Sequence, residues 1–267
     1  TSTVVGTNGV SLHVVSLGPE DGPPVVCLHG FPEFWYGWSP VARRLADAGY
    51  RVHLPDQRGY NDSEKPRGVA AYRLPTLAAD IEGLIDAMDE DTAHVVGHDW
   101  GMPTAYAYAA RHREEVQALA VMEAMLPGVR AEQKGMLWHV RFHQVRDLPE
   151  RLVSGNEEAY LKWFYREGAY DPSAIGREAL DEYVRSYSAP GGLRGGFEYY
   201  RAYEQDAEHN SEHAETDLEM PVLALGGEAS FRSMPVEDME AVATDVDGEV
   251  VQRAGHWSTE ARAALPC

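Results

Sequence analysis

The sequence predicts an α/β protein with a mostly parallel sheet and helices on both faces. Short apolar runs alternate with helix-like segments between Pro24 and Met122, and strands that alternate with helices form parallel sheets. In the same stretch, Gly97-His98-Asp99-Trp100-Gly101 lies between an apolar run and a segment of small residues. A glycine two residues away on each side of Asp99 predicts a sharp strand-to-helix corner, where strand and helix approach closely.

The elements before and after this corner follow the same alternation. Asn8-Gly9 predicts a hairpin turn between strands at 3–5 and 10–15. The continuous apolar run at 24–29 is typical of a strand that is covered on both faces. The further predicted elements are helix 40–48, strand 51–54, helix 77–88, strand 92–96, helix 102–111, and strands 117–122, 221–225 and 249–251.

One long segment, 127–217, interrupts the alternation. It carries helical signals without a convincing strand, and it is rich in Trp, Tyr, His and Arg. We expect a helical cap over the carboxyl ends of the strands, where open α/β sheets bind ligands. The predicted division is therefore a core of 1–126 and 218–267, with a cap of 127–217.

Composition limits the partners and the compartment. The 267 residues suffice for one domain with an insertion, and the formal net charge of −20 argues against nucleic acid or an anionic membrane as partner. No apolar run approaches the roughly 18 residues of a membrane span. Cys27 and Cys267 are the two cysteines and suggest no disulfide framework. We expect a cytoplasmic protein, and a homodimer is compatible with this composition.

Five segments together carry a resemblance to a known family. In chain order they are His29-Gly30-Phe31-Pro32, 56–60 (Asp-Gln-Arg-Gly-Tyr), the Asp99 corner, Glu123-Ala124 and Gly255-His256-Trp257. The chain resembles α/β-hydrolase-fold epoxide hydrolases over nearly its whole length. The resemblance implies an α/β-hydrolase fold with the cap inserted after the sixth strand. Only 11 residues follow His256, too few for the last helix of such folds, which favours a shortened terminus.

Asp99 occupies the nucleophile position of the corner. A carboxylate can attack an epoxide or carbon–halogen carbon and form an alkyl-enzyme ester, whereas esterases, lipases and peroxidases of this fold need a Ser. The alternative is an Asp that caps a helix. The backbone N–H groups of Phe31 and Trp100 are the expected oxyanion hole for hydrolysis of the ester. A purely structural loop is the alternative for Phe31.

His256, after the last strand, is the expected base that activates water against this ester. The acid that orients it is open between two residues. Many family members place an Asp after the seventh strand, where this chain has Ser230. A bacterial branch uses an acid after the sixth strand, and Glu123 fits that branch. We favour Glu123 over Glu228.

The departing epoxide oxygen needs hydrogen-bond donors, which family members supply from the cap. Tyr200 and His139 lie in segments that resemble those of the branch with a His and a Tyr. Tyr199 is the alternative to Tyr200, since neighbours on a helix point about 100° apart. Packed cap aromatics are the alternative reading of both donors. We expect Trp35, Trp100 and Tyr199 to line the substrate pocket.

Two other function classes remain open. Haloalkane dehalogenases share the Asp-Trp pair but usually carry Asn at the position of Phe31. Fluoroacetate-type dehalogenases usually carry Arg at the positions of Trp100 and Pro103. A non-catalytic binding protein of this fold would not require the complete set of Asp, Glu and His.

The preferred prediction is hydrolysis of an apolar, small-molecule epoxide to a vicinal diol through a covalent ester on Asp99. The reaction as drawn needs no cofactor, and no spacing of His, Cys or Glu in the sequence suggests a metal site.

Overall fold

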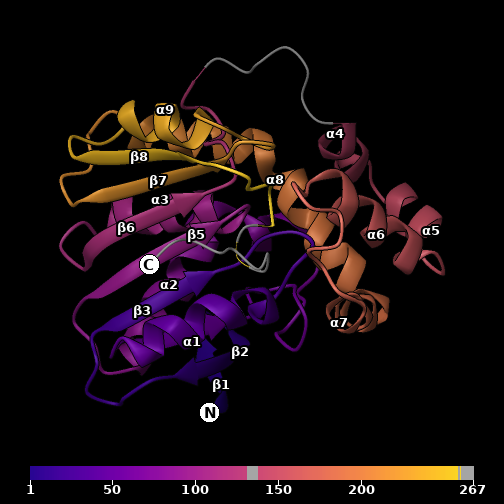
Figure 1. The fold of residues 1–267 in the computed structure, drawn as a ribbon, viewed down its shortest axis with the longest axis horizontal. Helices are drawn as coiled ribbons and strands as arrows, with labels where there is room; N and C mark the ends of the chain where they lie inside the picture. Colours follow the sequence, from indigo (N-terminus) through magenta and orange to yellow (C-terminus); the bar gives the residue numbers. More distant parts are fainter. Residues whose placement is uncertain (131–137, 258, 260–267) are drawn as a thin grey trace.

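A twisted sheet forms the centre of the molecule (Figure 1). The computed structural model describes residues 1–130, 138–257 and 259. Within them the sheet has eight strands in the order β1-β2-β4-β3-β5-β6-β7-β8. Only β2 runs antiparallel to its neighbours; all other pairs are parallel. The strands are β1 (Ser2–Thr7), β2 (Val10–Leu17), β3 (Pro24–Leu28), β4 (Arg51–Pro55), β5 (Ala93–His98), β6 (Val116–Met122), β7 (Val222–Gly227) and β8 (Val246–Val251).

Helices cover both faces of this sheet. On β3, Val25 and Cys27 pack in one hydrophobic cluster with Ala42 of α1, whereas Val26 and Leu28 pack in another with α2 and α3. This explains why β3 is apolar at every position, since its side chains alternate between two covered faces. The helices against the sheet are α1 (Ser39–Asp47), α2 (Leu74–Ala87), α3 (Gly101–Arg111) and α9 (Met234–Glu240).

Between β6 and β7 the described residues form helices joined by loops and turns. In Figure 1 this helical segment lies beyond one end of the strands. The ring of Tyr200 on α8 lies 5.0 Å from that of Trp100, which follows β5, so α8 crosses the carboxyl end of the sheet. The helices are α4 (Trp138–Gln144), α5 (Leu148–Val153), α6 (Glu157–Glu167), α7 (Arg177–Ser188) and α8 (Gly192–His213).

The predicted fold class is confirmed, but several element bounds and one helix differ from the sequence prediction. Helix α2 begins at Leu74, three residues before its predicted start. β8 begins at Val246, three residues before the predicted start. The prediction missed these residues because this part of the strand is mostly exposed and lacks an apolar pattern. Helix α9 was not predicted; its short sequence begins Met-Pro and is rich in acids. The boundaries of the cap stay a prediction. Residues 131–137 of the predicted cap, and 258 and 260–267 of the predicted core, lie outside the described residues.

Three glycines permit the close packing at the strand-to-helix corner. A Cβ on Gly97 would collide with the backbone of Gly101, and one on Gly101 with the Leu28 carbonyl. A Cβ on Gly30, in the loop after β3, would collide with Asp99. The corner, the start of α3 and the end of β3 are therefore in direct backbone contact. None of the described helices is both long and apolar enough to cross a membrane.

Replacing Gly101 by Ala is expected to destabilise the fold by about 2 kcal/mol or more, because the carbonyl it would meet is backbone and cannot move aside easily. Urea unfolding followed by circular dichroism measures the change. The matched control is Gly6→Ala, at an exposed position of β1 where no atom lies within 4 Å of the added carbon; we expect a change within about 0.5 kcal/mol. Equal losses in both variants would contradict the close packing at the corner.

Candidate active site

Asp99 stands at the corner between β5 and α3 in an unusual backbone conformation. Its φ is +51°, in the left-handed region that L residues other than Asn and Asp rarely adopt. Such conformations cost about 1–3 kcal/mol and concentrate at functional sites. Its side chain is 18% exposed, so the carboxylate is accessible from outside the core.

Two backbone N–H groups hold the carboxylate of Asp99. The Phe31 N–H donates to Oδ1 over 2.7 Å, and the Trp100 N–H also donates to the carboxylate. The loop reaches this position because Gly30 packs directly against Asp99. Both predicted oxyanion-hole donors thus point at the same carboxyl group.

His256 lies between two carboxylates. Its Nε2 is 3.5 Å from Oδ2 of Asp99, and its Nδ1 is 3.3 Å from Oε2 of Glu123. The backbone N–H of His256 donates to the Gly168 carbonyl over 2.6 Å, which attaches the loop after β8 to the helical segment. The arrangement is the Asp–His–acid geometry of a hydrolytic triad.

Glu123, rather than Glu228, faces His256. Glu123 follows β6 and is 1% exposed; its Oε1 accepts the Gly227 N–H, and Ser230 also hydrogen-bonds to it. Glu228 is exposed, and its carboxylate instead accepts the N–H of Arg253 over 2.9 Å. The turn after β7, where many family members carry the acid, here supports the acid of the neighbouring strand.

The charges of this buried group stabilise one another. Burial alone would lower the pKa of His256, but hydrogen bonds to Asp99 and Glu123 raise it to about 10. Burial raises the pKa of Asp99 and of Glu123, and the hydrogen bond and charge of His256 outweigh that and lower both. The resting site is thus an imidazolium between two carboxylates.

The predicted donors of the cap lie across from Asp99. Tyr200 is 3% exposed, and its ring lies 5.0 Å from Trp100 and 5.9 Å from His139. Burial and then the charge of Asp99 raise the pKa of Tyr200 well above its usual value, so its hydroxyl keeps the proton. Burial lowers the pKa of His139 to about 4, although Asp99 raises it, so this imidazole is neutral at pH 7.

Tyr199 points elsewhere. Its buried hydroxyl donates to the Arg58 carbonyl over 3.0 Å, in the loop after β4. Its ring still lies 5.9 Å from that of Trp100. Trp35 is farther from the group: its aromatic neighbours are His13, Phe34 and Tyr36. Among the residues predicted to line the pocket, the structure brings Trp100 to Asp99 and leaves Trp35 apart.

Comparison with known proteins identifies the family of this chain. The family model for the alpha/beta hydrolase fold matches residues 23–260. The chain is 35% identical to the AB hydrolase superfamily protein YfhM of Bacillus subtilis, over 98% of this chain and 93% of that protein. It is 34% identical to the soluble epoxide hydrolase of a Corynebacterium species, over 95% and 90% of the two chains. The solved structure of the epoxide hydrolase CorEH without ligand superposes with a TM-score of 0.91, at 32% identity over 97% and 93%.

The chain belongs to the α/β-hydrolase family of epoxide hydrolases. The predicted resemblance is therefore confirmed, and the predicted enzyme class, a hydrolase, with it.

Two residues beside the site, His98 and His143, were not predicted from the sequence. Buried His98 lies 2.9 Å from a carboxylate oxygen of Glu33, and its Nε2 is 2.7 Å from the His256 carbonyl. This chain of contacts fixes the backbone that carries His256. The signal in the sequence was His98 itself, a polar residue at the end of a mostly apolar strand.

His143 is the second missed residue. It lies one turn after His139 on α4, and its ring is 4.4 Å from Tyr200. Its Nε2 is 2.6 Å from the Tyr160 hydroxyl. Burial lowers its pKa well below the usual range, so it is a neutral part of the aromatic wall around Phe31, 4.9 Å away. The spacing of two His four residues apart was the available signal.

One group among the described residues has the composition of a metal site. Donor atoms of His13, Asp56 and Asp62 lie within 4.8 Å of one another. However, Asp56 already accepts hydrogen bonds from the Trp35 N–H and the Asn61 amide, and it lies 2.8 Å from Nδ1 of His13. These contacts are those of a residue that fixes the loop after β4.

The stability of this hydrolase should fall from pH 7 to pH 10 through His256. Its folded pKa, about 10, exceeds the unfolded value of 6.5, so the stabilisation is full below pH 6.5 and is lost as pH rises through 10. We expect the difference in unfolding free energy between wild type and His256→Gln to shrink by at least about 1 kcal/mol over this range.

Urea unfolding at pH 7, 8.5 and 10 measures this effect. The control is His94→Gln, because burial lowers the pKa of His94 and that imidazole does not titrate in this range. A constant difference between wild type and His256→Gln at the three pH values would contradict the paired imidazolium.

Proposed function

We propose that this chain hydrolyses an apolar epoxide to a vicinal diol in two steps, through a covalent ester on Asp99. Relatives that are named epoxide hydrolases support the reaction class. The observation that carries the mechanism is the position of Asp99: its carboxylate lies between two N–H donors and His256, with Tyr200 and His139 across from it. The aromatic rings around this space suit an apolar substrate.

In the first step Asp99 attacks one epoxide carbon. Oδ1 is held by the Phe31 N–H, so Oδ2 forms the new bond to carbon, and the carbon–oxygen bond of the epoxide breaks. Tyr200 gives its proton to the departing oxygen while His139 donates a hydrogen bond. Their raised and lowered pKa values keep both groups as protonated, uncharged donors before the reaction.

In the second step water attacks Cγ of the ester. Once Asp99 is esterified it carries no charge, so the pKa of His256 falls and the imidazolium can release its proton, which restores Tyr200. Neutral His256, still oriented by Glu123, then takes a proton from water. The N–H groups of Phe31 and Trp100 stabilise the oxyanion on Oδ1. The diol leaves with the former Oδ2 and takes its proton from His256. The new carboxyl group of Asp99 then gives its proton to His256, which restores the resting ion pair.

The alternative of dehalogenation has less support. A dehalogenase uses the indole N–H beside the nucleophile as a halide donor, and here that group of Trp100 donates to the Tyr200 hydroxyl. The position of a second halide donor is Phe31, whose ring contacts aromatic rings of α4, α6, α7 and α8.

A single turnover in ¹⁸O-labelled water tests the ester. Enzyme in excess over styrene oxide, as an apolar probe epoxide, should place label in the peptide that contains Asp99, and the first diol should be unlabelled, because water attacks Cγ and the product keeps Oδ2. Mass analysis of the digested protein measures this. Label in the diol and none in the Asp99 peptide would mean direct attack of water on the epoxide.

His256→Gln should accumulate the ester, because the base for its hydrolysis is gone while Asp99 remains. Intact-protein mass after incubation with the probe epoxide should rise by the mass of one substrate, and turnover should fall at least about a thousandfold. His94→Gln is the matched control and should turn over normally. An inactive His256→Gln protein of unchanged mass would count against the two-step scheme.

Tyr200→Phe should reduce epoxide turnover by about a hundredfold or more, since it removes the proton donor to the departing oxygen. Tyr199→Phe is the matched control: it removes the hydroxyl that binds the Arg58 carbonyl, and turnover should change less than about fivefold. Steady-state kinetics with one epoxide measures both, and thermal unfolding checks that each variant folds. If the loss is larger in Tyr199→Phe, the assignment of the donor is wrong.

A further inference from the structure

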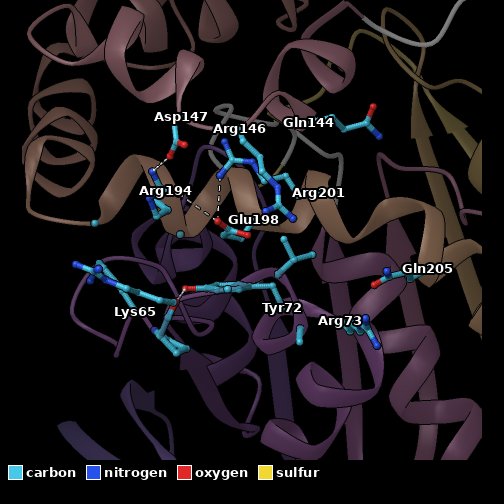
Figure 2. Close-up of a pocket in the computed structure, with 17 residues that line it drawn as sticks. Lys65, Tyr72, Arg73, Gln144, Arg146, Asp147, Arg194, Glu198, Arg201 and Gln205 are labelled. Carbon is cyan, nitrogen blue, oxygen red and sulfur yellow. Dashed lines mark hydrogen bonds and ion pairs between the residues drawn. The ribbon is translucent and has the colours of Figure 1, made fainter.

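A large polar cavity lies away from the catalytic group, between α8 and the loop before α2. Its volume is about 930 Å³, within the range of small-molecule sites. One wall is the segment 65–73, and the other is formed by α8 and residues after α4. Figure 2 shows Lys65, Tyr72 and Arg73 on the first wall, opposite Arg194, Glu198 and Arg201 on the second.

This cavity does not belong to the catalytic group. The side chains of α8 that line it recur every three or four positions and therefore share one face of the helix. They are Arg194, Glu198, Arg201 and Gln205. Tyr200 projects from a different face, toward Trp100. One helix thus separates two sites.

The lining is strongly cationic in a chain whose net charge is −20. Among the described residues two carboxylates line the cavity, Asp147 and Glu198, and both pair with lining arginines. Against them stand six cationic side chains. These are Lys65, Arg67, Arg73, Arg146, Arg194 and Arg201.

Part of this positive charge has no carboxylate partner. Arg194 lies 2.6 Å from Asp147, and Arg201 lies 2.9 Å from Glu150. The four other cations, which include Arg73 and Arg146, form no ion pair with any residue that the structure describes. The charge of Asp206 acts on Arg73, although the two groups form no ion pair. Guanidinium groups that form no ion pair attract a multivalent anion from facing walls.

Buried donors in the lining also lack partners. The side chain of Arg201 is 3% exposed, and its Nε is buried without a hydrogen-bond acceptor. The Nε of Arg73, on the opposite wall, is also buried without a hydrogen-bond acceptor. A buried N–H without an acceptor costs about 1–3 kcal/mol. Both guanidinium groups thus keep unused donor capacity beside the cavity.

We propose that this cavity binds a small organic anion, an organic phosphate or polycarboxylate, whose charged groups bridge Arg73 and Arg146. Planar guanidinium groups match the paired oxygens of phosphate and carboxylate. Pro66, Val69 and the ring of Tyr72 supply apolar surface for the organic part. The proposal is independent of the epoxide reaction, because none of these residues touches the catalytic group.

Titration calorimetry with pyrophosphate and with citrate tests the site, at constant ionic strength set with NaCl. We expect one of the two to bind with a Kd of about 1 mM or tighter, and Arg73→Gln and Arg146→Gln each to weaken binding at least about tenfold. Tighter binding of pyrophosphate would assign a phosphate ligand, and tighter binding of citrate a polycarboxylate.

Arg43→Gln is the matched control, because it removes the same charge from an exposed position on α1. It should leave the Kd unchanged. Thermal unfolding supplies a second readout: the anion should raise the Tm of wild type and of Arg43→Gln, and raise it less in the two cavity variants. The proposal is overturned if neither anion binds, or if Arg43→Gln weakens binding as much as the cavity variants do.

Discussion

The close approach of three backbone segments around Asp99 is the constraint on which the rest of the site depends. The end of β3, the corner after β5 and the start of α3 meet at distances that exclude a Cβ at Gly30, Gly97 and Gly101. This packing turns the Phe31 N–H toward Asp99 and fixes the left-handed conformation of the aspartate. Any wider corner would move the carboxylate away from its donors.

A second dependence is electrostatic. Three ionised groups share a buried space, and each is stable in its charged form only through the others. The same coupling connects structure to the proposed chemistry, because Asp99 and Glu123 together keep His256 protonated. In the proposed reaction a covalent bond removes the charge of Asp99, and the imidazole then changes from an ion-pair partner to a base. One residue can thus serve two successive roles without moving.

Helix α8 organises the other side of the site. It carries Tyr200 toward the corner and holds Tyr199 against the loop after β4. A further face presents Arg194, Glu198 and Arg201 to the cationic cavity. The periodicity of the helix allows one 22-residue segment to serve these separate environments.

The sequence by itself determined the fold class, the corner and the kinds of residue at the ends of the strands. These features are local: alternation of apolar runs, glycine spacing and chain order are visible within short windows. Tertiary structure alone decided which candidate meets which partner. His256 and Glu123 are 133 positions apart, and Glu228 lies next to the same loop yet points to Arg253. Likewise the sequence favours Tyr200 over its neighbour Tyr199 only by resemblance, and the packing of α8 shows where each side chain lies. The cationic cavity joins three distant segments, so no window of sequence contains it. Contacts of this kind depend on how whole elements pack, and packing is a property of the assembled chain.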